Sequence, residues 1–297
     1  MVLLASRMEK ELPEGILVEQ ATVNKNGIFV SKDVAEKTVW DKLAIENPTH
    51  AVISAKDEES AAKKSETQIQ DIKLHLKEGD VLLDCGTGYG RVAKYLLPQM
   101  ELGGYIGLDS AYQMLQLFKE RYDRTEAEQG TPLLLLNADI HTIPITEQSV
   151  DVVIVCAVFL HNHKNVVARS MTEITRVVKP GGKVLVYSSF PRSMTFMGLQ
   201  GGLYQMFLNL LGRPYKNGPV RYYRGNEINR LFEKFTEVEL FPVGYSVLPK
   251  TLIFLPGPLE MVYRVGIANP INRLLEKITP TRLKPYFAVH YDVVATR

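Results

Sequence analysis

The middle of the chain alternates between short apolar runs and longer segments that carry one apolar face. Five of the runs are apolar almost throughout, and they span residues 81–84, 105–109, 133–139, 150–159 and 183–189. Strands with this pattern are buried on both faces and are typical of a parallel sheet that helices cover on both sides. We therefore predict a doubly wound α/β domain in which right-handed crossovers join neighbouring parallel strands.

Helical periodicity fills the intervals between these runs and also precedes them. Three such segments span residues 90–100, 110–122 and 165–178, with Pro180-Gly181-Gly182 as the stop after the last. Upstream, residues 57–76 form a highly charged segment whose apolar residues gather near its end, which predicts a helix with one solvated side. Residues 32–43 predict a shorter helix with Trp40 and Leu43 on one face, and Pro48 limits it.

Beyond residue 189 the strand-helix rhythm weakens. Two segments, at about 190–225 and 250–275, are rich in Met, Phe, Leu, Tyr and Gly. The pattern is completed by a helix at 226–235 and strands at 238–248 and 286–297. We predict a core of residues 77–297 that carries two insertions, preceded by a mainly helical extension of residues 1–76.

Composition and charge narrow this picture only slightly. The chain has 297 residues, of which 45% are hydrophobic and 23% charged, as in ordinary globular proteins. Its formal net charge of +2 argues neither for nor against nucleic acid as a partner. The N-terminal apolar stretch is too short for a signal peptide, and no run approaches the roughly 20 apolar residues of a membrane span. We predict a cytoplasmic protein, and contact with a membrane surface stays open.

The two cysteines, Cys85 and Cys156, each end an apolar run. Free cysteine is often buried and behaves as a small hydrophobic residue. We therefore predict two reduced thiols rather than a disulfide.

A glycine-rich loop follows the first predicted strand, in the stretch VLLDCGTGYGR from Val81 to Arg91. In doubly wound sheets, ligands bind outside the carboxyl ends of the strands, and glycines let the backbone turn sharply close to a ligand. The spacing is G-x-G-x-G, and Arg91 stands where the dinucleotide fingerprint G-x-G-x-x-G has its third glycine. Asp84 at the strand end would repel a pyrophosphate, so it favours a ligand that presents an amine.

Two more acids end the next two predicted strands. Asp109 can accept hydrogen bonds from both hydroxyls of a ribose. Asp139 can accept one from the exocyclic amine of an adenine. Together with Asp84, these carboxylates offer partners to an ammonium, a ribose and an adenine amine.

These motifs together resemble those of the class I S-adenosylmethionine-dependent methyltransferases. VLLDCGTGYG resembles the first motif of that family, YIGLD the acidic second motif, NADIHTIPITEQSVDVVIV the third and fourth strands, and RVVKPGGKVLV the approach to the fifth strand. The four follow one another in family order and cover about residues 75–190. PYFAVHYDVVATR is compatible with the family's antiparallel last strand, and WDKLAIENPTHAV resembles a segment that precedes the core in some members.

The resemblance implies a Rossmann-like, seven-stranded sheet, mostly parallel, with S-adenosyl-L-methionine as cofactor. It implies that helices of the extension cover the cofactor site and that the two insertions form a lid over the acceptor. The implied cofactor residues are, for the methionine end, Asp84, Cys85, Gly86 and Gly88; for the ribose, Asp109; for the adenine, Ser110, Met114, Asp139 and Ile140; and beside the sulfonium, Cys156 and Ala157.

Two histidines, His161 and His163, follow the fourth strand in FLHNHKN, beside the expected position of the methyl group. Methyl transfer is an in-line displacement, and an oxygen nucleophile benefits from a base. Either histidine is therefore a candidate base. The alternative is that His161 packs against the core and caps the next helix. No Cys or acid accompanies the pair at ligand spacing, so we predict no metal site.

The acceptor pocket is expected from the two insertions. Their Met and aromatic residues suit a bulky apolar ligand; they are Phe190, Met194, Phe196, Met197, Tyr204, Met206, Phe207, Phe254, Met261 and Tyr263. Gly201, Gly202 and Gly212 are candidate hinges of a lid. The alternative is that these helices pack on the core or on a dimer partner, and the oligomeric state stays open.

A basic and aromatic segment ends the first insertion, and it comprises Arg213, Tyr215, Lys216, Arg221, Tyr222, Tyr223 and Arg224. Such residues bind RNA, an acidic acceptor or an anionic membrane surface, or they form a solvated loop. No added RNA-binding module is visible in the sequence, and together with the nearly balanced net charge this disfavours nucleic acid.

The sequence therefore predicts methyl transfer to a small, hydrophobic or lipid-like acceptor, at oxygen or carbon rather than nitrogen. The alternatives are an NAD(P)-dependent oxidoreductase, a non-catalytic cofactor-binding subunit, and a methyltransferase for RNA or protein.

Overall fold

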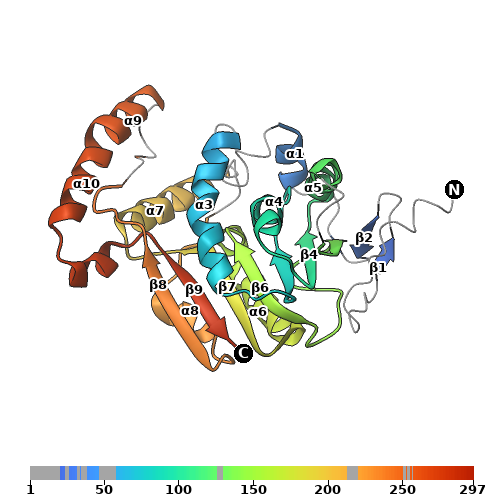
Figure 1. The fold of residues 1–297 in the computed structure, drawn as a ribbon. Helices are drawn as coiled ribbons and strands as arrows, with labels where there is room; N and C mark the ends of the chain where they lie inside the picture. The colour runs from blue at the N-terminus through green and yellow to red at the C-terminus, as the bar shows by residue number, and fades with distance from the viewer. Residues whose placement is uncertain are drawn as a thin grey trace.

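The computed structural model describes residues 21–23, 27–31, 34, 39–46, 58–125, 130–212, 220–249, 252, 255 and 257–297. They form one nine-stranded sheet in the order β1-β2-β5-β4-β3-β6-β7-β9-β8, with helices on both faces (Figure 1). The strands are β1 (Ala21–Val23), β2 (Ile28–Ser31), β3 (Val81–Cys85), β4 (Gly104–Asp109), β5 (Leu133–Asn137), β6 (Val150–Cys156), β7 (Val178–Pro191), β8 (Glu237–Val243) and β9 (His290–Thr296).

The strands from β2 to β7 pair in parallel, whereas β9 lies antiparallel between β7 and β8. The predicted doubly wound, mostly parallel sheet with an antiparallel last strand is therefore confirmed. All seven predicted strands are present, although β7, β8 and β9 each have one end four or five residues from its predicted position.

The strand count of seven was too low, because the N-terminal extension adds β1 and β2 to the sheet edge. Strand β2 runs parallel to β5, with Ile28 opposite Leu135, and β1 pairs antiparallel with β2. The extension is thus not only helical. The signal for this hairpin was two short runs of strand-forming character, at 21–23 and 28–30, on either side of Asn26-Gly27.

The helices are α1 (Val39–Glu46), α3 (Glu58–Leu74), α4 (Arg91–Leu96), α5 (Tyr112–Thr125), α6 (Lys164–Val177), α7 (Phe196–Leu210), α8 (Gly225–Leu231), α9 (Gly257–Tyr263) and α10 (Asn269–Ile278). Short 3₁₀ turns lie at η2 (Leu97–Gln99), η3 (Phe159–His161) and η5 (Thr281–Phe287), and a π-helical turn, η4 (Arg264–Ala268), joins α9 to α10.

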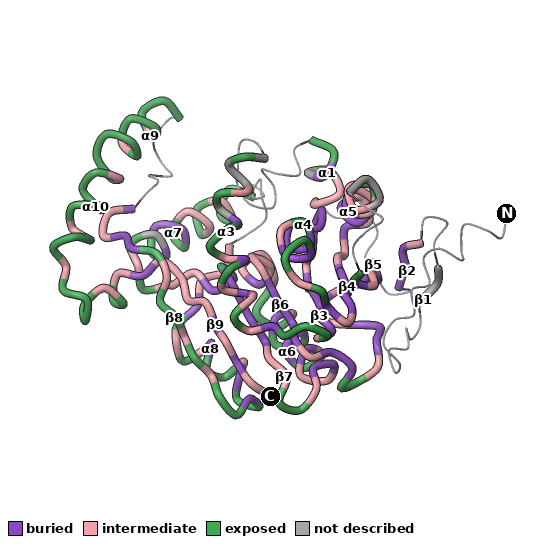
Figure 2. Tube along the Cα trace, in the orientation of Figure 1, coloured by how far each residue is buried: buried purple, intermediate pink, exposed green. Residues whose placement is uncertain are grey.

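The sheet separates two buried clusters of apolar side chains. Helices α6 and α8 complete one cluster, whereas α3, α4 and α5 complete the other. Neighbouring residues of one strand enter opposite clusters, as Leu82 and Leu83 do. This arrangement explains why the central strands are apolar at consecutive positions, and Figure 2 shows them as the most continuously buried part of the chain.

Several predicted element boundaries were wrong, among them the end of β8, which lies at Val243 instead of residue 248, and the end of α1, which lies at Glu46 instead of residue 43. Two further differences lie close to the site. Strand β7 begins at Val178, so Pro180-Gly181-Gly182 lies inside an irregular strand instead of forming a turn before it. Helix α5 begins at Tyr112 rather than at residue 110, because the Asp109 carboxylate accepts a hydrogen bond from Ala111 N–H at the turn before it.

Both predicted insertions contain helices with many exposed apolar side chains. Residues 190–225 contain α7, and residues 250–275 contain α9 and most of α10, which extend away from the sheet at the left of Figure 1. Residues 213–219 and Phe254 lie outside the described residues. No helix in the described part of the chain is both long enough and apolar enough to cross a bilayer.

Candidate functional site

The carboxyl ends of the parallel strands bring the predicted site residues to one edge of the sheet. Cys85 lies opposite Leu108 and Val155, and Asp109 lies opposite Asn137. At the next strand pair, Cys156 lies opposite Tyr187. The glycine loop after β3 thus stands between the ends of β4 and β6, where the sequence placed a ligand.

The glycine loop is held in a conformation that only glycine adopts easily. Gly86 has φ +75°, and a Cβ there would lie 2.3 Å from Cγ2 of Val158. The Gly86 and Thr87 N–H groups both donate to the Leu108 carbonyl, at 2.7 and 3.1 Å. The missing side chain of Gly86 therefore lets the loop after β6 close against the glycine loop.

Gly90 meets a similar constraint on the other side of the loop. Its φ is +79°, and a Cβ there would lie 2.3 Å from the Phe118 ring of α5. The glycine is thus required both by the backbone turn and by the close approach of α5.

The Asp109 carboxylate joins the glycine loop to the end of β4. Its Oδ2 accepts from Gly88 N–H at 2.8 Å, and its Oδ1 accepts from Ala111 N–H at 2.8 Å. An ionised carboxylate has about four lone-pair sites, so each oxygen keeps one more acceptor position. Burial raises the pKa of Asp109 to about 6, against the two backbone hydrogen bonds, which lower it.

Asp84 differs from Asp109 in being only 1% exposed. It accepts a hydrogen bond from the Tyr105 hydroxyl at 2.5 Å. Burial raises the pKa of Asp84, while the Tyr105 hydrogen bond and the positive charge of Arg91 oppose the rise. The sequence did not predict Tyr105 as a partner, because its register next to β3 depends on strand pairing.

Arg91, which stands in the place of the third fingerprint glycine, ties the glycine loop to the N-terminal extension. Its side chain is buried, with Nη1 donating to Ser65 Oγ at 3.1 Å and Nη2 to Gln68 Oε1 at 2.7 Å. Both partners lie on α3. A charged side chain at this position therefore has a structural reason that a dinucleotide fingerprint would not supply.

The residues predicted for the adenine lie on the loops after β4 and β5 and in the first turn of α5. The Asn137 amide donates to the carbonyls of Asp109 and Ser110, both at 3.0 Å, which fixes the end of β4. Met114 is buried in a small cluster with Ala44 of α1. Ile140 is buried and Asp139 half-buried in the loop after β5.

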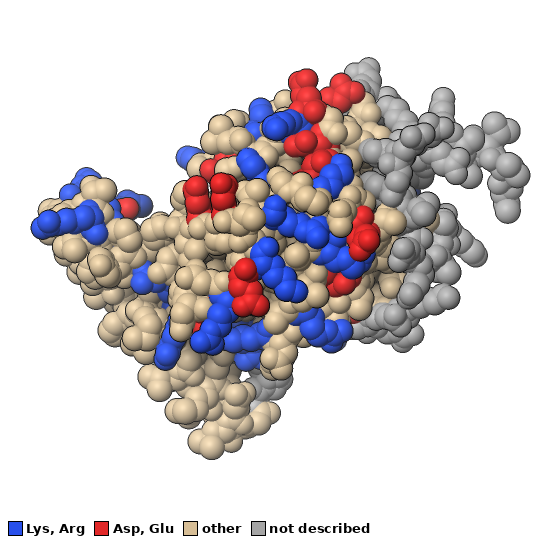
Figure 3. Space-filling model, turned by 90° about the horizontal axis from the view of Figure 1, so that it is seen from below, with Lys and Arg blue, Asp and Glu red and all other residues tan. Residues whose placement is uncertain are grey.

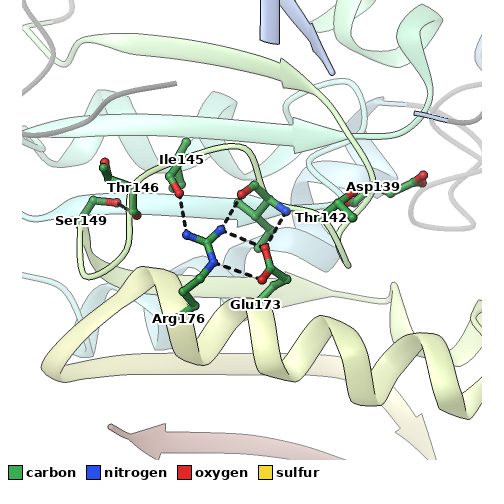
Figure 4. Close-up of polar contacts among 8 residues, drawn as sticks. Asp139, Thr142, Ile145, Thr146, Ser149, Glu173 and Arg176 are labelled. Carbon is green, nitrogen blue, oxygen red and sulfur yellow. Dashed lines mark hydrogen bonds and ion pairs between the residues drawn. The ribbon is translucent and has the colours of Figure 1, made fainter. Parts of the chain in front are cut away.

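A salt-bridged pair on α6, Glu173 and Arg176, holds the loop after β5 in place (Figure 4). Arg176 donates to the carbonyls of Ile143 and Ile145 at 2.6 and 2.8 Å, and Glu173 accepts from Ile143 N–H at 3.0 Å. The Asp139 side chain points away from this network in Figure 4. The pair was not predicted; its only sequence signal is the i, i+3 spacing of opposite charges on a helix.

Beyond β6, the chain turns through Cys156 and Ala157. Ala157 has φ +59°, which is unusual for a residue with a Cβ, and its N–H donates to the Tyr187 carbonyl at 2.9 Å. Both cysteines are free, as predicted, with Cys85 buried and Cys156 half-buried. Burial raises the pKa of Cys156 to about 12, so the group at this strand end is a neutral thiol.

His161 ends the short 3₁₀ turn that follows β6. Its ring meets the edge of the Trp40 ring of α1, with centroids 5.1 Å apart. Nδ1 is buried and has no hydrogen-bond partner among the described residues, and burial lowers the pKa of the imidazole. A neutral ring with an open nitrogen is able to take up a proton.

His163 is placed differently. It is exposed at the N-cap position of α6, and its Nε2 lies 3.1 Å from Nη2 of Arg221. Arginine only donates, so this nitrogen acts as an acceptor. The alternative in which His161 caps the next helix is wrong, because His163 holds that position.

The described part of the basic and aromatic segment is built into the fold. Arg221 N–H donates to the Leu160 carbonyl at 2.7 Å, the Tyr223 ring is buried, and Arg224 caps α8 with Glu227. These contacts favour the interpretation of residues 221–224 as a packed loop. Among the described residues, no three His, Cys, Asp or Glu side chains gather as metal ligands would.

Comparisons with known proteins agree with this geometry. A family model described as a methyltransferase domain matches residues 83–186. Demethylmenaquinone methyltransferases of Bacillus cereus (strain ATCC 10987 / NRS 248) and Bacillus anthracis (strain CDC 684 / NRRL 3495) are each 30% identical over 192 residues, which is 62% of this chain and 74% of theirs.

Two solved structures show the same fold. A chain of the complex between the Haloferax volcanii Trm112 methyltransferase activator and a methyltransferase aligns with a TM-score of 0.56 and 17% identity, over 88% of this chain and 99% of that one. Haemonchus contortus phosphoethanolamine N-methyltransferase 2, in complex with phosphomonomethylethanolamine and S-adenosylhomocysteine, aligns with a TM-score of 0.51 and 16% identity, over 79% and 53%.

Proposed function

Because the chain belongs to the class I S-adenosylmethionine-dependent methyltransferases, we propose that it methylates a small hydrophobic acceptor and that this acceptor is a quinone-type ring. The oxidoreductase and non-catalytic alternatives are thereby set aside. The observation that carries the acceptor class is the 30% identity to demethylmenaquinone methyltransferases over 74% of their length. The apolar character of the two insertions supports the same class.

The strand-end residues fit the cofactor that the family uses, which supplies an electrophilic methyl group when bound. Asp109 keeps one acceptor position on each oxygen, which suits two neighbouring ribose hydroxyls. Asp139 points away from the Glu173–Arg176 pair and suits the adenine amine. The buried carboxylate of Asp84, with Gly86 beside it, suits the methionine ammonium.

With the three acids assigned to the ribose, the adenine amine and the methionine ammonium, the other predicted cofactor residues fall along the rest of the proposed cofactor site. Ser110 and Ile140 lie near the proposed adenine end, on the loops that follow β4 and β5, and Met114 lies near it in the first turn of α5. Cys156 and Ala157 lie at the end of β6, beside the reacting centre. Cys85 and Gly88 contribute backbone rather than side chains.

Helix α1 covers this edge of the sheet in our proposal. It contacts the residues that follow two different strands, since Trp40 meets His161 after β6 and Ala44 packs with Met114 of α5 after β4. A cover of this kind excludes water from the reacting groups.

His161 is the base that we favour. Its buried Nδ1 has no hydrogen-bond partner among the described residues, and the lowered pKa keeps the ring neutral near pH 7, so it can accept a proton from a hydroxyl of the reduced, quinol form of the acceptor ring. Loss of that proton makes the oxygen, or the ring carbon adjacent to the carbon that bears it, a stronger nucleophile. In His163, by contrast, the acceptor nitrogen already faces Arg221.

The test is methyl transfer from radiolabelled S-adenosylmethionine to a short-chain demethylmenaquinol in detergent. We expect a methylated product whose formation S-adenosylhomocysteine inhibits. Binding of S-adenosylhomocysteine without methylation of any quinol, together with turnover of an amine, RNA or protein acceptor, would refute the quinone proposal and leave the family assignment intact.

A further inference from the structure

Helix α7 has the reverse of the usual surface-helix pattern. Its buried residues are small or polar, namely Gly198, Gln200 and Gly201. Its large exposed residues are all apolar and follow one helical stripe; they are Phe196, Leu199, Leu203, Met206, Phe207 and Leu210. The helix contains no charged residue, and Leu210 is 84% exposed.

Contacts on the buried face of α7 explain why its apolar stripe points to solvent. A Cβ on Gly201 would lie 2.0 Å from the Tyr222 hydroxyl oxygen, so a larger residue there would displace the Tyr222 side chain. The Gln205 amide donates to the Val220 carbonyl at 2.6 Å. These contacts fix α7 with its apolar stripe outward.

A second apolar surface lies on the arm formed by α9, η4, α10 and η5. On α10, Ile271, Leu274 and Ile278 recur at i, i+3 and i+7, so they share one face, and all three are exposed. The opposite face attaches the arm, because Asn272 is buried and its Oδ1 accepts from the Val247 and Leu248 N–H groups at 2.9 and 3.0 Å. The exposed residues of α9 and η4 continue the apolar surface with Leu259, Met261, Val262, Val265 and Ile267.

Basic side chains accompany the apolar surface of the arm. Its positively charged residues are Arg264, Arg273, Lys277, Arg282 and Lys284, and its negatively charged ones are Glu260 and Glu276. Arg264 is paired with Glu260. In Figure 3 the arm is the protrusion at the left, and its outer end carries mostly Lys and Arg.

From this combination we propose that α7 and the α9–α10 arm form a docking surface for an anionic lipid bilayer. Exposed apolar stripes flanked by Lys and Arg are the features of helices that lie in a membrane interface, where leucines enter the acyl boundary and cations meet lipid phosphates. In this proposal the uncharged stripe of α7 inserts into the acyl boundary of the bilayer, and the basic residues of the arm are attracted to the anionic lipid headgroups. The inference goes beyond the proposed function and does not depend on it, because it concerns binding in the absence of acceptor and cofactor.

A second copy of the chain fits this surface less well. A two-fold dimer would set the patch against itself. The excess of basic residues on one arm would then face the same excess on the other, and like charges repel.

The test is co-sedimentation of the full chain with vesicles of phosphatidylcholine alone or with roughly one-third phosphatidylglycerol. We expect binding to the anionic vesicles and weaker binding to the neutral ones. The variant Leu203→Asp/Leu210→Asp should lose more than about tenfold in partition coefficient, because each leucine no longer enters the acyl boundary. Arg273→Gln/Lys277→Gln should lose about fivefold per charge on anionic vesicles only, since each basic residue near the surface contributes attraction.

The matched control is Leu74→Asp on α3, because Leu74 is 79% exposed but lies outside both apolar surfaces. It should bind vesicles like the unaltered chain. S-adenosylhomocysteine affinity and thermal unfolding check that every variant is folded. Equal sedimentation with and without vesicles would overturn the proposal. So would a stable dimer by light scattering that Leu203→Asp/Leu210→Asp converts to a monomer, since that result would assign the surface to a second copy.

Discussion

At the scale of single residues, Asp109 combines a structural contact that the fold shows with the ribose-binding role that we propose for it. The same carboxylate orders the glycine loop through Gly88 N–H and keeps acceptor positions for a ligand. Burial disfavours its charge and raises its pKa to about 6. In the free protein at mildly acidic pH, a substantial fraction of Asp109 is therefore protonated, and only the ionised carboxylate accepts strong hydrogen bonds.

The affinity for S-adenosylhomocysteine should consequently depend on pH. Ribose hydroxyls donate to the ionised carboxylate, so binding lowers the pKa of Asp109 and releases a proton. Affinity should rise as pH increases through about 6 and level off above 7. Calorimetry from pH 5 to 8 measures this.

The variant Asp109→Asn isolates this carboxylate from Asp84, whose pKa is also raised by burial. It should bind roughly 10- to 100-fold more weakly at pH 8, because one or two charge-assisted hydrogen bonds are lost, and its pH dependence near 6 should be much reduced. Unchanged affinity at pH 8 would contradict the ribose assignment.

A second residue-scale prediction concerns His161. His161→Gln should lower kcat by about 100-fold or more, the usual contribution of a general base, while S-adenosylhomocysteine affinity stays within about twofold. Because burial lowers the pKa of the imidazole, the acid limb of kcat should lie below pH 6.5 and should vanish in the variant. His163→Gln is the matched control and should lose much less. An equal loss in both variants, with the acid limb retained in His161→Gln, would remove His161 from the base role.

At the scale of elements, regular periodicity was a good guide wherever tertiary contacts agree with it. Strand β3 was expected at 81–84 and spans Val81–Cys85, because consecutive apolar residues feed two separate cores. The guide failed at β7, where Pro180-Gly181-Gly182 predicts a turn on local grounds alone. There the Gly181 N–H donates to the Arg297 carbonyl, a contact from the far end of the chain.

Side chains that hold a distant loop through its backbone also cannot be predicted from local periodicity. The partners of Arg176 are backbone carbonyls some thirty residues away, so no side-chain type marks them. Arg176→Ala should lower the free energy of unfolding by roughly 1–3 kcal/mol, because a partly buried charge-assisted pair of hydrogen bonds is lost. It should also weaken S-adenosylhomocysteine binding severalfold, since the loop that carries Asp139 loosens.

Chemical denaturation and calorimetry test this, with Arg169→Ala on the same helix as control. Arg169 is exposed, so its removal should change the unfolding free energy by less than about 0.5 kcal/mol. Similar destabilisation in both variants would mean that the clamp contributes nothing beyond its surface charge.

For the whole molecule, the sequence located one half of the site and not the other. The meeting of the acids and glycines at the strand ends was predictable, because the carboxyl ends of parallel strands always lie at the same edge of a sheet. The contacts from the N-terminal extension were not, since Trp40 on His161, and Ser65 and Gln68 on Arg91, join segments whose meeting depends on the complete fold. The outward apolar stripe of α7 was likewise hidden, because composition alone does not tell an inner face from an outer one.

If helix α1 of the extension covers the bound cofactor, the fluorescence of Trp40 on this helix should respond to cofactor binding. Trp40 is the only tryptophan in the chain, and it lies against His161 at the edge of the sheet where we propose that the cofactor binds. S-adenosylhomocysteine should therefore change the intrinsic fluorescence, with a midpoint equal to the Kd from calorimetry. Trp40→Phe should abolish the signal and weaken binding only a few-fold, because an aromatic cover is retained. Calorimetric binding with no change in emission would mean that α1 stays apart from the cofactor, and the closed site would then need another cover.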